Sequence, residues 1–442
     1  MNPGDAKVME MEISPNTQYN KLRTSATHSL LRLKIHYCIP TTNPQGVVSF
    51  ANAENWLMHD DLAAFINDHN RFDKRCCAYG EGYTGTLRLR SAMATHLNTH
   101  FQPTKAITAE EITFATGVTN LNETSASVLC DPDQDDATML GRPVYGAFSR
   151  DLAMRTNIHL EYVSVGDTEQ ISPACVLAFG AGFEAAKARG INNAVGQVEC
   201  YSRETLIGLL YPCASKGIHL ISDEIYGFSV YEREDRQPET FTPVRAIDFN
   251  GIINPNQVHV LHGMSKDFGA GSMRLGCIIS ENEDFTKATR AICRFSSPSQ
   301  FSTDLTAKFL EDQDFVTNFL HKLHHCLLQS RLLAEDLLAR KGISYSPYGD
   351  AGLFLWLDLS SHLPLHEING DGWAAQRLLS RRFSEGSVII STGEEYRAPN
   401  PGRFRLVFCV DPDTLKEGNI ARSSQLRTWT ESDDTKGLGI TK

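Results

Sequence analysis

One lysine stands between two apolar runs in the stretch HVLHGMSKDFGAGSMRLGCIIS, residues 259–280. The first run opens into a loop of small residues that holds Ser265 and Lys266, and Arg274 follows just before the second run. A lysine at the end of a buried strand can lose its hydration, which is what a Schiff-base lysine needs. An arginine offers a planar fork of donors that suits a phosphate. The same pattern would also fit an ordinary solvated loop lysine, so other residues must decide between the two interpretations.

Further polar residues follow other predicted strands. Val118 and Thr119 come after the strand ITFATG, at the start of a predicted helix, where free N–H groups suit a phosphate. Asp223 and Tyr226 come after the strand IHLIS. A doubly wound sheet binds ligands at the carboxyl ends of its strands, so we expect these residues to meet Lys266. A ligand that needs a phosphate site, a carboxylate, a phenol and a lysine is pyridoxal 5′-phosphate.

The wider pattern predicts an α/β fold. Apolar strand-like and helical segments alternate from about residue 112 to about residue 280, which indicates a parallel sheet flanked by helices. After about residue 300 a long helical stretch leads into a strand, a helix and two further strands, an α+β pattern. We expect an N-terminal arm over residues 1–55 that joins the smaller domain. A large cofactor-binding domain would cover residues 56–300, with a mostly parallel doubly wound sheet, and a small C-terminal domain residues 301–442.

Composition restricts the class of protein. The chain has 442 residues, a net charge of −11 and no basic stripe, which argues against a nucleic-acid partner. The start lacks the pattern of a secretory signal, no apolar run is long enough to span a membrane, and the eleven cysteines form no C-x-x-C pair. These features predict a soluble cytoplasmic protein. The cluster His321, His324 and His325 is interpreted as a solvated helix face, so no metal is expected.

With these motifs in place, the chain resembles the fold type I pyridoxal-phosphate enzymes. Within them it is most similar to the branch of the 1-aminocyclopropane-1-carboxylate (ACC) synthases and related class I and II aminotransferases. The resemblance runs in the family's order over about residues 43–420. Its motifs are NPQGVVSFANAEN, YGEGYTG, GVTNLNE, RPVYGAFSRDL, SDEIY, SKDFGAGSMRLG, AGLFLWLDL and PGRFRLVF.

The resemblance assigns the first roles around the cofactor. Lys266 would form the internal aldimine and then act as the general base at Cα. Asp223 would pair with the protonated pyridine nitrogen, and Tyr226 would hydrogen-bond the phenolic oxygen. Ser265, next to the lysine, counts among the residues that bind the cofactor.

Further roles follow from the same resemblance. Arg274 would bind the phosphate together with the turn at Val118 and Thr119. Tyr145 would stack on the pyridine ring. Arg405 would bind the substrate α-carboxylate through two hydrogen bonds.

The remaining roles concern the substrate amine and the partner subunit. Glu54 would lie near the substrate amine. Tyr83 would reach the phosphate of a neighbouring subunit, which implies a homodimer with shared sites and an amino-acid substrate.

Two departures from the family pattern stand out. Gly263 occupies the place of a phosphate-binding serine three residues before the lysine. The family's buried strand with its Asn-Pro-x-Asn-Pro-x-Gly end is also missing, and only INNAVGQVE remains, which predicts a truncated central strand. Asn192 or Asn193 would be the available substitutes for the family asparagine. The Tyr83-Thr84-Gly85 turn lacks the histidine of the ACC synthases as well.

Three functions remain open from the sequence. The first is an aminotransferase acting on an α-amino acid through an external aldimine and a Cα carbanion. The second is a lyase of the ACC-synthase or carbon–sulfur-cleaving kind, which uses the same residues because the cofactor carries the chemistry. The third is a degenerate protein of the same fold without turnover. The divergence from the ACC synthases resembles that of enzymes of secondary metabolism.

Overall fold

The fold is built on a large sheet with helices on both faces. The computed structural model describes residue 43 and residues 46–164, 173–191, 194–198, 201–235, 241–346 and 351–417. Within these ranges the large sheet has seven strands in the order β2-β8-β7-β6-β5-β3-β4. Neighbours from β4 to β7 pair in parallel, whereas β8 pairs antiparallel with both β7 and β2. The expectation of a mostly parallel α/β sheet is therefore confirmed. The strand bounds are β2 Ile112–Ala115, β3 Ala137–Arg142, β4 His159–Ser164, β5 Ala194–Val198, β6 Leu220–Asp223, β7 Val258–Gly263 and β8 Gly276–Ser280.

Strand β5 corrects one expectation. The short segment AVGQV still forms a strand that pairs in parallel with β3 on one side and β6 on the other. The neighbouring strands therefore keep their hydrogen-bond partners, and the sheet is not interrupted. Asn192 and Asn193 lie outside the described residues.

Several of the described helices begin where a short polar side chain caps them. Thr86, Ser202 and Asn282 each accept a hydrogen bond from a backbone N–H in the first turn of the helix that follows. The described helices contain none that is long and apolar enough to cross a membrane. Their bounds are α3 His59–His69, α4 Leu87–Phe101, α5 Val118–Leu129, α6 Phe148–Asp151, α7 Cys175–Ala188, α8 Arg203–Lys216, α9 Glu283–Cys293, α10 Gln300–Glu311, α11 Gln313–Ala339, α12 Gly372–Glu385 and α13 Pro412–Glu417.

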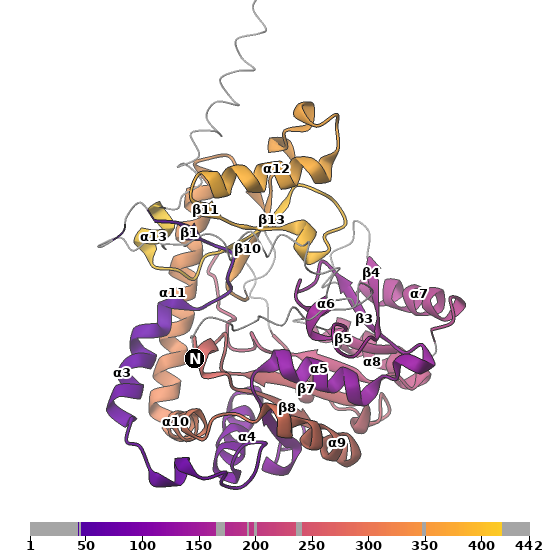
Figure 1. Ribbon diagram of the computed structural model, residues 1–442, viewed down its shortest axis with the longest axis vertical. Coiled ribbons are helices and arrows are strands. Elements are labelled where there is room, and N and C mark those ends of the chain that lie inside the picture. Colours follow the sequence, from indigo (N-terminus) through magenta and orange to yellow (C-terminus); the bar gives the residue numbers. More distant parts are fainter. Residues whose placement is uncertain are drawn as a thin grey trace, which may run out of the picture.

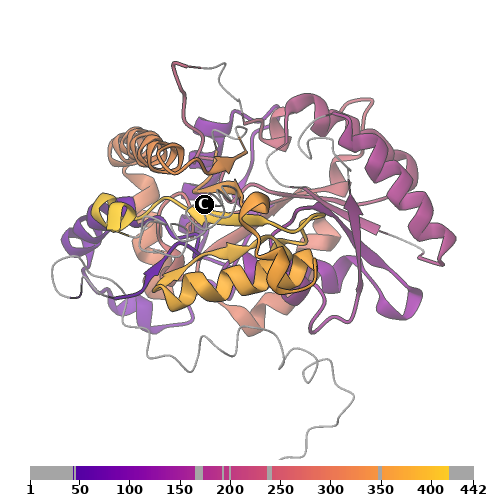
Figure 2. The same cartoon turned by 90° about the horizontal axis from the view of Figure 1, so that it is seen from above.

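A second, antiparallel sheet lies above the large one in Figure 1. Its order is β12-β13-β10-β9, with bounds β9 Ser344–Tyr345, β10 Phe354–Asp358, β12 Ser391–Thr392 and β13 Arg403–Val407. Helix α12 lies over it and is seen on the side of the viewer from above (Figure 2). The short strand β1, Val48–Ser49, pairs in parallel with β11, Val388–Ile389. The described end of the arm is thus hydrogen-bonded to the C-terminal part of the chain. The domain boundaries at residues 55 and 300 stay a prediction.

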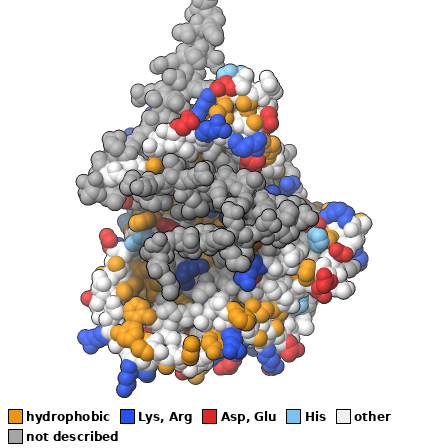
Figure 3. Space-filling model, viewed as in Figure 1, with side chains coloured by type: hydrophobic (Ala, Val, Ile, Leu, Met, Phe, Trp, Pro, Cys, Tyr) orange, Lys and Arg blue, Asp and Glu red, His pale blue; other side chains and the backbone are white. Residues whose placement is uncertain are grey.

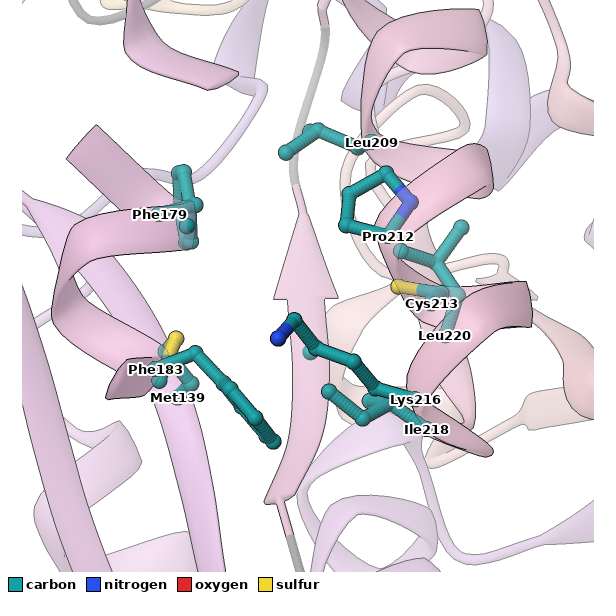
Figure 4. Close-up of a pocket in the computed structure, with 11 residues that line it drawn as sticks. Met139, Phe179, Phe183, Leu209, Pro212, Cys213, Lys216, Ile218 and Leu220 are labelled. Atoms are coloured by element: carbon teal, nitrogen blue, oxygen red, sulfur yellow. The ribbon is translucent and has the colours of Figure 1, made fainter. Parts of the chain in front are cut away.

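Helices α7 and α8 leave a small apolar pocket over β5. Figure 4 shows Phe179 and Phe183 of α7 facing Leu209 and Lys216 of α8 across this strand. The pocket shares no residue with the predicted cofactor site. Apart from Lys216, the side chains that line the pocket are apolar, so the pocket offers few groups for specific recognition. We interpret it as a packing gap.

This gap leads to a stability prediction within α7. A Cβ at Gly180 would meet nothing within 4 Å, whereas a Cβ at Gly182 would lie 2.7 Å from Val163 Cγ2. Gly180→Ala should raise the free energy of unfolding by about 0.5–1 kcal/mol, because alanine loses less conformational entropy in a helix than glycine. The matched Gly182→Ala should lower it by about 1–3 kcal/mol through overpacking. Urea denaturation of both variants measures these changes. Equal changes in the free energy of unfolding would contradict the claim that a Cβ has room at Gly180 and not at Gly182.

Candidate active site

The strand ends of the large sheet bring Asp223 and the lysine loop to one edge. Strands β6 and β7 are parallel neighbours, so Asp223 at the end of β6 lies beside the loop that leaves β7 at Gly263. That loop is closed by a hydrogen bond from Met264 N to Leu275 O of 3.1 Å. Within it, Lys266 is half-buried, and its Nζ donates a 2.8 Å hydrogen bond to Ala53 O.

The surroundings of Lys266 show which predicted residues the fold brings together. Burial lowers the pKa of Lys266 below its ordinary value, and the nearby Arg405 and, more weakly, Arg274 lower it further. Glu54 and Asp223 act in the opposite direction on the same pKa. Four predicted site residues, from the arm, the large sheet, the lysine loop and the second sheet, are therefore close enough to influence one amine.

At the start of α5, a corner of the fold brings together groups that suit a phosphate. Gly117 caps this helix with φ +88° and without a side-chain cap, so the first-turn N–H groups beginning at Val118 have no capping acceptor in the described part of the chain. Arg274 lies beside them, with Nη2 donating to Thr116 O at 3.1 Å and Nη1 to Gly271 O at 2.9 Å. A Cβ on Gly276 would lie 2.5 Å from Val118 N.

Thr119 and Asp151 meet on the same side of α5. Thr119 is exposed, and its side chain hydrogen-bonds Asp151. Burial raises the pKa of Asp151 to about 6, and the bond to Thr119 opposes that rise. The Thr119 hydroxyl already has this partner, so the helix N–H groups and Arg274 form the more direct phosphate site.

Gly263 has a structural reason in this chain. A Cβ at this position would lie 2.7 Å from Leu275 O and 2.9 Å from Gly276 Cα, so the backbones of β7 and β8 approach too closely for a serine. The close approach of the two strands therefore explains why this position holds a glycine and not a serine. The phosphate contact that a serine would supply has no substitute at this position.

Arg405 lies in the centre of the second sheet. Strand β13 pairs with β10 and β12, and Arg405 is opposite Trp356 and Ser391 in the two registers. Its side chain is only 6% exposed, and its Nη2 donates to Ala51 O. Its Nε is buried and has no hydrogen-bond partner among the described residues. An orphaned guanidinium donor of this kind fits a carboxylate that approaches from outside the protein.

Aromatic side chains connect Arg405 with the large sheet. The ring of Tyr145 is 42% exposed and packs edge-on against Phe148, with centroids 5.3 Å apart. Partial burial of its hydroxyl raises the pKa of Tyr145, and the nearby Arg405 opposes that rise. Tyr226 packs edge-on against Phe354 at 6.0 Å. An exposed aromatic ring beside these groups is suited to stacking on a planar ligand.

Two residues at this site were missed by the sequence analysis. The guanidinium carbon of Arg405 lies 4.5 Å from the ring centroid of Tyr396 and 5.1 Å from that of Phe354. Phe354 lies on β10, far from β13 along the chain, whereas Tyr396 ends the turn shortly before β13, and no spacing rule connects either ring with Arg405. The AGLFLWLDL motif includes Phe354, but nothing in it marks that phenylalanine as an arginine contact.

The remaining predicted residues are placed less closely around Lys266. Ser265 is half-buried next to it, and Glu54 is exposed. Tyr83 is half-buried and contacts Tyr79 and Arg294, with ring centroids 6.1 Å apart and the Arg294 guanidinium 5.6 Å away. Within one chain, Tyr83 therefore lies against Tyr79 and Arg294.

The histidine cluster has no metal-like geometry in the part of the chain that is described. There, no three His, Cys, Asp or Glu side chains are grouped as metal ligands. His324 hydrogen-bonds the Phe228 carbonyl oxygen at 2.8 Å.

On the face shown in Figure 3, apolar side chains reach the surface below the grey atoms.

The fold and the grouping of Asp223, Arg274 and Arg405 around Lys266 suit a class of enzymes that bind a phosphate-bearing aldehyde cofactor through a lysine. The model of the aminotransferase class I and II family matches residues 67–419. An archaeal alanine:glyoxylate aminotransferase superposes with a TM-score of 0.71 at 19% identity, covering 87% of this chain and 91% of that one. Aspartate aminotransferase from Thermus thermophilus gives a TM-score of 0.65 at 17% identity, with coverages of 86% and 91%.

Curated relatives narrow the class further. ACC synthase 6 of Oryza sativa subsp. japonica is 29% identical over 89% of this chain and 74% of its own length. ACC synthase 3 of the same organism is 30% identical, with 84% of each chain covered. ACC synthase-like protein 1 of Homo sapiens is 28% identical, with coverages of 83% and 73%.

The chain belongs to the class I and II aminotransferase family, in the branch of the ACC synthases. It is a fold type I enzyme, and its cofactor is pyridoxal 5′-phosphate. The residues present fit that group: a desolvated amine at Lys266, a carboxylate at Asp223, and uncapped N–H groups with Arg274 for the phosphate.

Proposed function

We propose that this protein is a pyridoxal-phosphate-dependent aminotransferase that acts on a free α-amino acid. The observation that carries the proposal is the pair of donors held by one short segment, residues 50–55, which we call the strap. Lys266 donates to Ala53 O and Arg405 donates to Ala51 O, two residues apart. An amine and a guanidinium at that separation suit the reacting end and the carboxylate of one amino acid.

The cofactor would supply an electron sink for charge that develops at the substrate Cα. Lys266 would hold the cofactor and then move the Cα proton, and burial favours the neutral amine that this transfer needs. Asp223 would keep the pyridine nitrogen protonated, and Tyr226 would hydrogen-bond the phenolic oxygen. Arg274 with the Val118–Thr119 turn would bind the phosphate, and Tyr145 would cover the ring. Ser265 would complete the loop beside the lysine.

Arg405 would bind the α-carboxylate. Its Nε lacks a partner in the described part of the chain, and burial of an unpaired charged donor costs free energy unless an acceptor arrives. The Ala51 carbonyl accepts a hydrogen bond from Nη2 of the same guanidinium without neutralising its charge. A carboxylate would satisfy both needs at once.

A second candidate function is a lyase with the same residues. It is favoured by the curated relatives, which are named ACC synthases, and by Glu54, which is close enough to raise the pKa of Lys266. In a lyase a leaving group would depart from the substrate side chain after the same proton transfer. The choice depends on which bond the site aligns.

A panel of amino acids tests the two candidates. The cofactor-loaded protein is incubated with each amino acid and a keto-acid acceptor, and keto acid, ammonia and thiol are measured separately. An aminotransferase forms keto acid and new amino acid in equal amounts and only when the acceptor is present. Product release without an acceptor would favour the lyase, and no turnover of any substrate by cofactor-loaded protein would contradict both.

The same proposal includes a homodimer with shared sites. Phe72, Tyr79 and Phe295 are 62%, 82% and 90% exposed, an unusual exposure for aromatic rings. Tyr79 and Arg294, the neighbour of Phe295, both contact Tyr83. A second copy of the chain covering this surface would bury the rings and bring Tyr83 to the partner's phosphate site.

Subunit mixing tests the shared site. Tyr83→Phe should weaken cofactor binding by about tenfold or more, because a hydrogen bond to a charged phosphate is lost, without separating the subunits. Mixing Tyr83→Phe with Lys266→Ala chains should restore activity, since one of the two sites in the hybrid has both residues. Hybrids verified by mass that stay inactive would argue that each chain completes its own site.

A further inference from the structure

The aromatic contacts of Arg405 point to a residue without an assigned role. Tyr396 ends the short turn η11, Gly393–Tyr396, and is 8% exposed. Its ring lies 4.5 Å from the Arg405 guanidinium carbon, with the Phe354 ring at 5.1 Å. Trp356 packs edge-on against Tyr396, with centroids 5.8 Å apart and planes at 84°. The ring of Tyr396 is therefore itself held in place.

The hydroxyl of Tyr396 joins the same set of contacts. It hydrogen-bonds Ser391, whose Oγ donates to Ala51 O at 3.4 Å. Ala51 O also accepts from Arg405. Ring and hydroxyl of Tyr396 thus both reach the arginine, one directly and the other through the strap.

The backbone of Tyr396 is attached to the large sheet. Its carbonyl oxygen accepts a 2.8 Å hydrogen bond from Val144 N, next to Tyr145. A Cβ on Gly146 would collide with Glu395 O, so this approach requires glycine. In addition, the guanidinium of Arg397 lies 5.2 Å from the Tyr162 ring centroid. The turn that carries Tyr396 therefore contacts Val144 and Gly146 after β3, and Arg397, which follows the turn, contacts strand β4.

We infer that Tyr396 is a positioning residue, which fixes the plane of the Arg405 guanidinium and ties it to the Tyr145 segment. The inference rests on the proposed carboxylate role of Arg405. A guanidinium that packs against two aromatic rings cannot tilt freely, and its edge is the part that it offers to a ligand. The hydrogen bond at Val144 sets the distance between this edge and the segment that would cover the cofactor. Tyr396 would touch neither the reacting atoms nor the cofactor.

The test measures binding of 2-aminoisobutyrate, an α-amino acid without a Cα proton, to cofactor-loaded protein by calorimetry. Tyr396→Leu should weaken this binding by about 3- to 30-fold, because the cation–π contact is lost. KM for a turned-over amino acid should rise by a similar factor, with kcat changed by less than about threefold. Tyr396→Phe keeps the ring and should restore binding to within about threefold of the wild type. Cofactor affinity should stay constant in both variants.

A second variant keeps the test independent of the ring. Gly146→Ala displaces the Glu395 carbonyl and should also raise KM, with Arg405 and Tyr396 both intact. Wild-type binding by folded Tyr396→Leu, or equal losses in the Leu and Phe variants, would overturn the inference. Wild-type KM in folded Gly146→Ala would overturn the attachment to the large sheet.

Arg405→Lys separates this inference from the proposed function. If Arg405→Lys binds 2-aminoisobutyrate more weakly and Tyr396→Leu binds it as the wild type does, only the positioning role is contradicted. Unchanged binding in Arg405→Lys would overturn both, because there would then be no carboxylate site to position.

Discussion

Replacing Lys266 with alanine should abolish covalent capture of the cofactor and lower turnover by at least about 10²- to 10⁴-fold. The first effect follows because Lys266 offers a half-buried amine next to the predicted phosphate corner, and the second because a positioned general base contributes about that factor. Borohydride reduction of wild-type protein should fix the cofactor to one peptide, and mass spectrometry should find that peptide to contain Lys266. A Lys266→Ala protein that still captures the cofactor covalently would show that another lysine does so.

Two control variants make this result specific. Lys266→Arg keeps a positive charge but cannot react with an aldehyde, so it should behave like Lys266→Ala. Lys216→Ala removes a lysine that is ion-paired with Glu184 and lies over the Phe183 ring, away from the site. It should leave capture and turnover unchanged. Loss of capture in a normally folded Lys216→Ala protein would contradict the assignment of capture to Lys266 alone.

The pH dependence should follow from the same lysine. Burial and the nearby Arg405 lower the pKa of Lys266, which means that the neutral amine forms at a lower pH than for an exposed lysine. Arg405→Lys leaves a cation at this position. The acid limb of the pH–rate profile should therefore stay close to that of the wild type, although KM rises.

Arg405→Lys should cost about 1.5–3 kcal/mol of transition-state stabilisation, roughly 10- to 150-fold in kcat/KM. The lysine keeps the charge but loses the two-point fork of donors that a carboxylate engages. Steady-state kinetics with the best amino acid of the panel measure this loss. Cofactor affinity should not change, because the phosphate corner lies at Arg274 and the start of α5.

Arg403→Lys is the matched control on the same strand. Arg403 is ion-paired with Asp358 at 2.8 Å and is partly exposed, so a lysine there should preserve most of the pairing. Its kcat/KM should stay close to that of the wild type. Equal losses in the two variants would remove the carboxylate role of Arg405, and an unaffected Arg405→Lys enzyme would mean that the substrate is not a free α-amino acid.

The sequence by itself determined which residues could form a cofactor site. Asp223, Lys266 and Arg274 each follow or precede a buried apolar run, and strands that alternate with helices must run in parallel with their carboxyl ends together. Local pattern therefore sufficed to predict that these side chains meet. The strand formed by the short segment AVGQV was harder to predict from the sequence. A five-residue strand is recognisable only when its neighbours supply the hydrogen bonds, as β3 and β6 do here.

Only the tertiary structure decided what surrounds Arg405. Alternation places Arg403 and Arg405 on the same face of β13, and no local signal separates them. In the folded chain Arg403 meets Asp358, whereas Arg405 lies between Phe354 and Tyr396 under the strap. Asp358 and Phe354 come from β10, far from Arg405 in the sequence, and Tyr396 comes from the turn before β13. Gly146 is required by the approach of the Glu395 backbone, and Gly263 by the close approach of β7 to the start of β8. Such contacts depend on where distant segments end up in space, which periodicity along one chain segment does not encode.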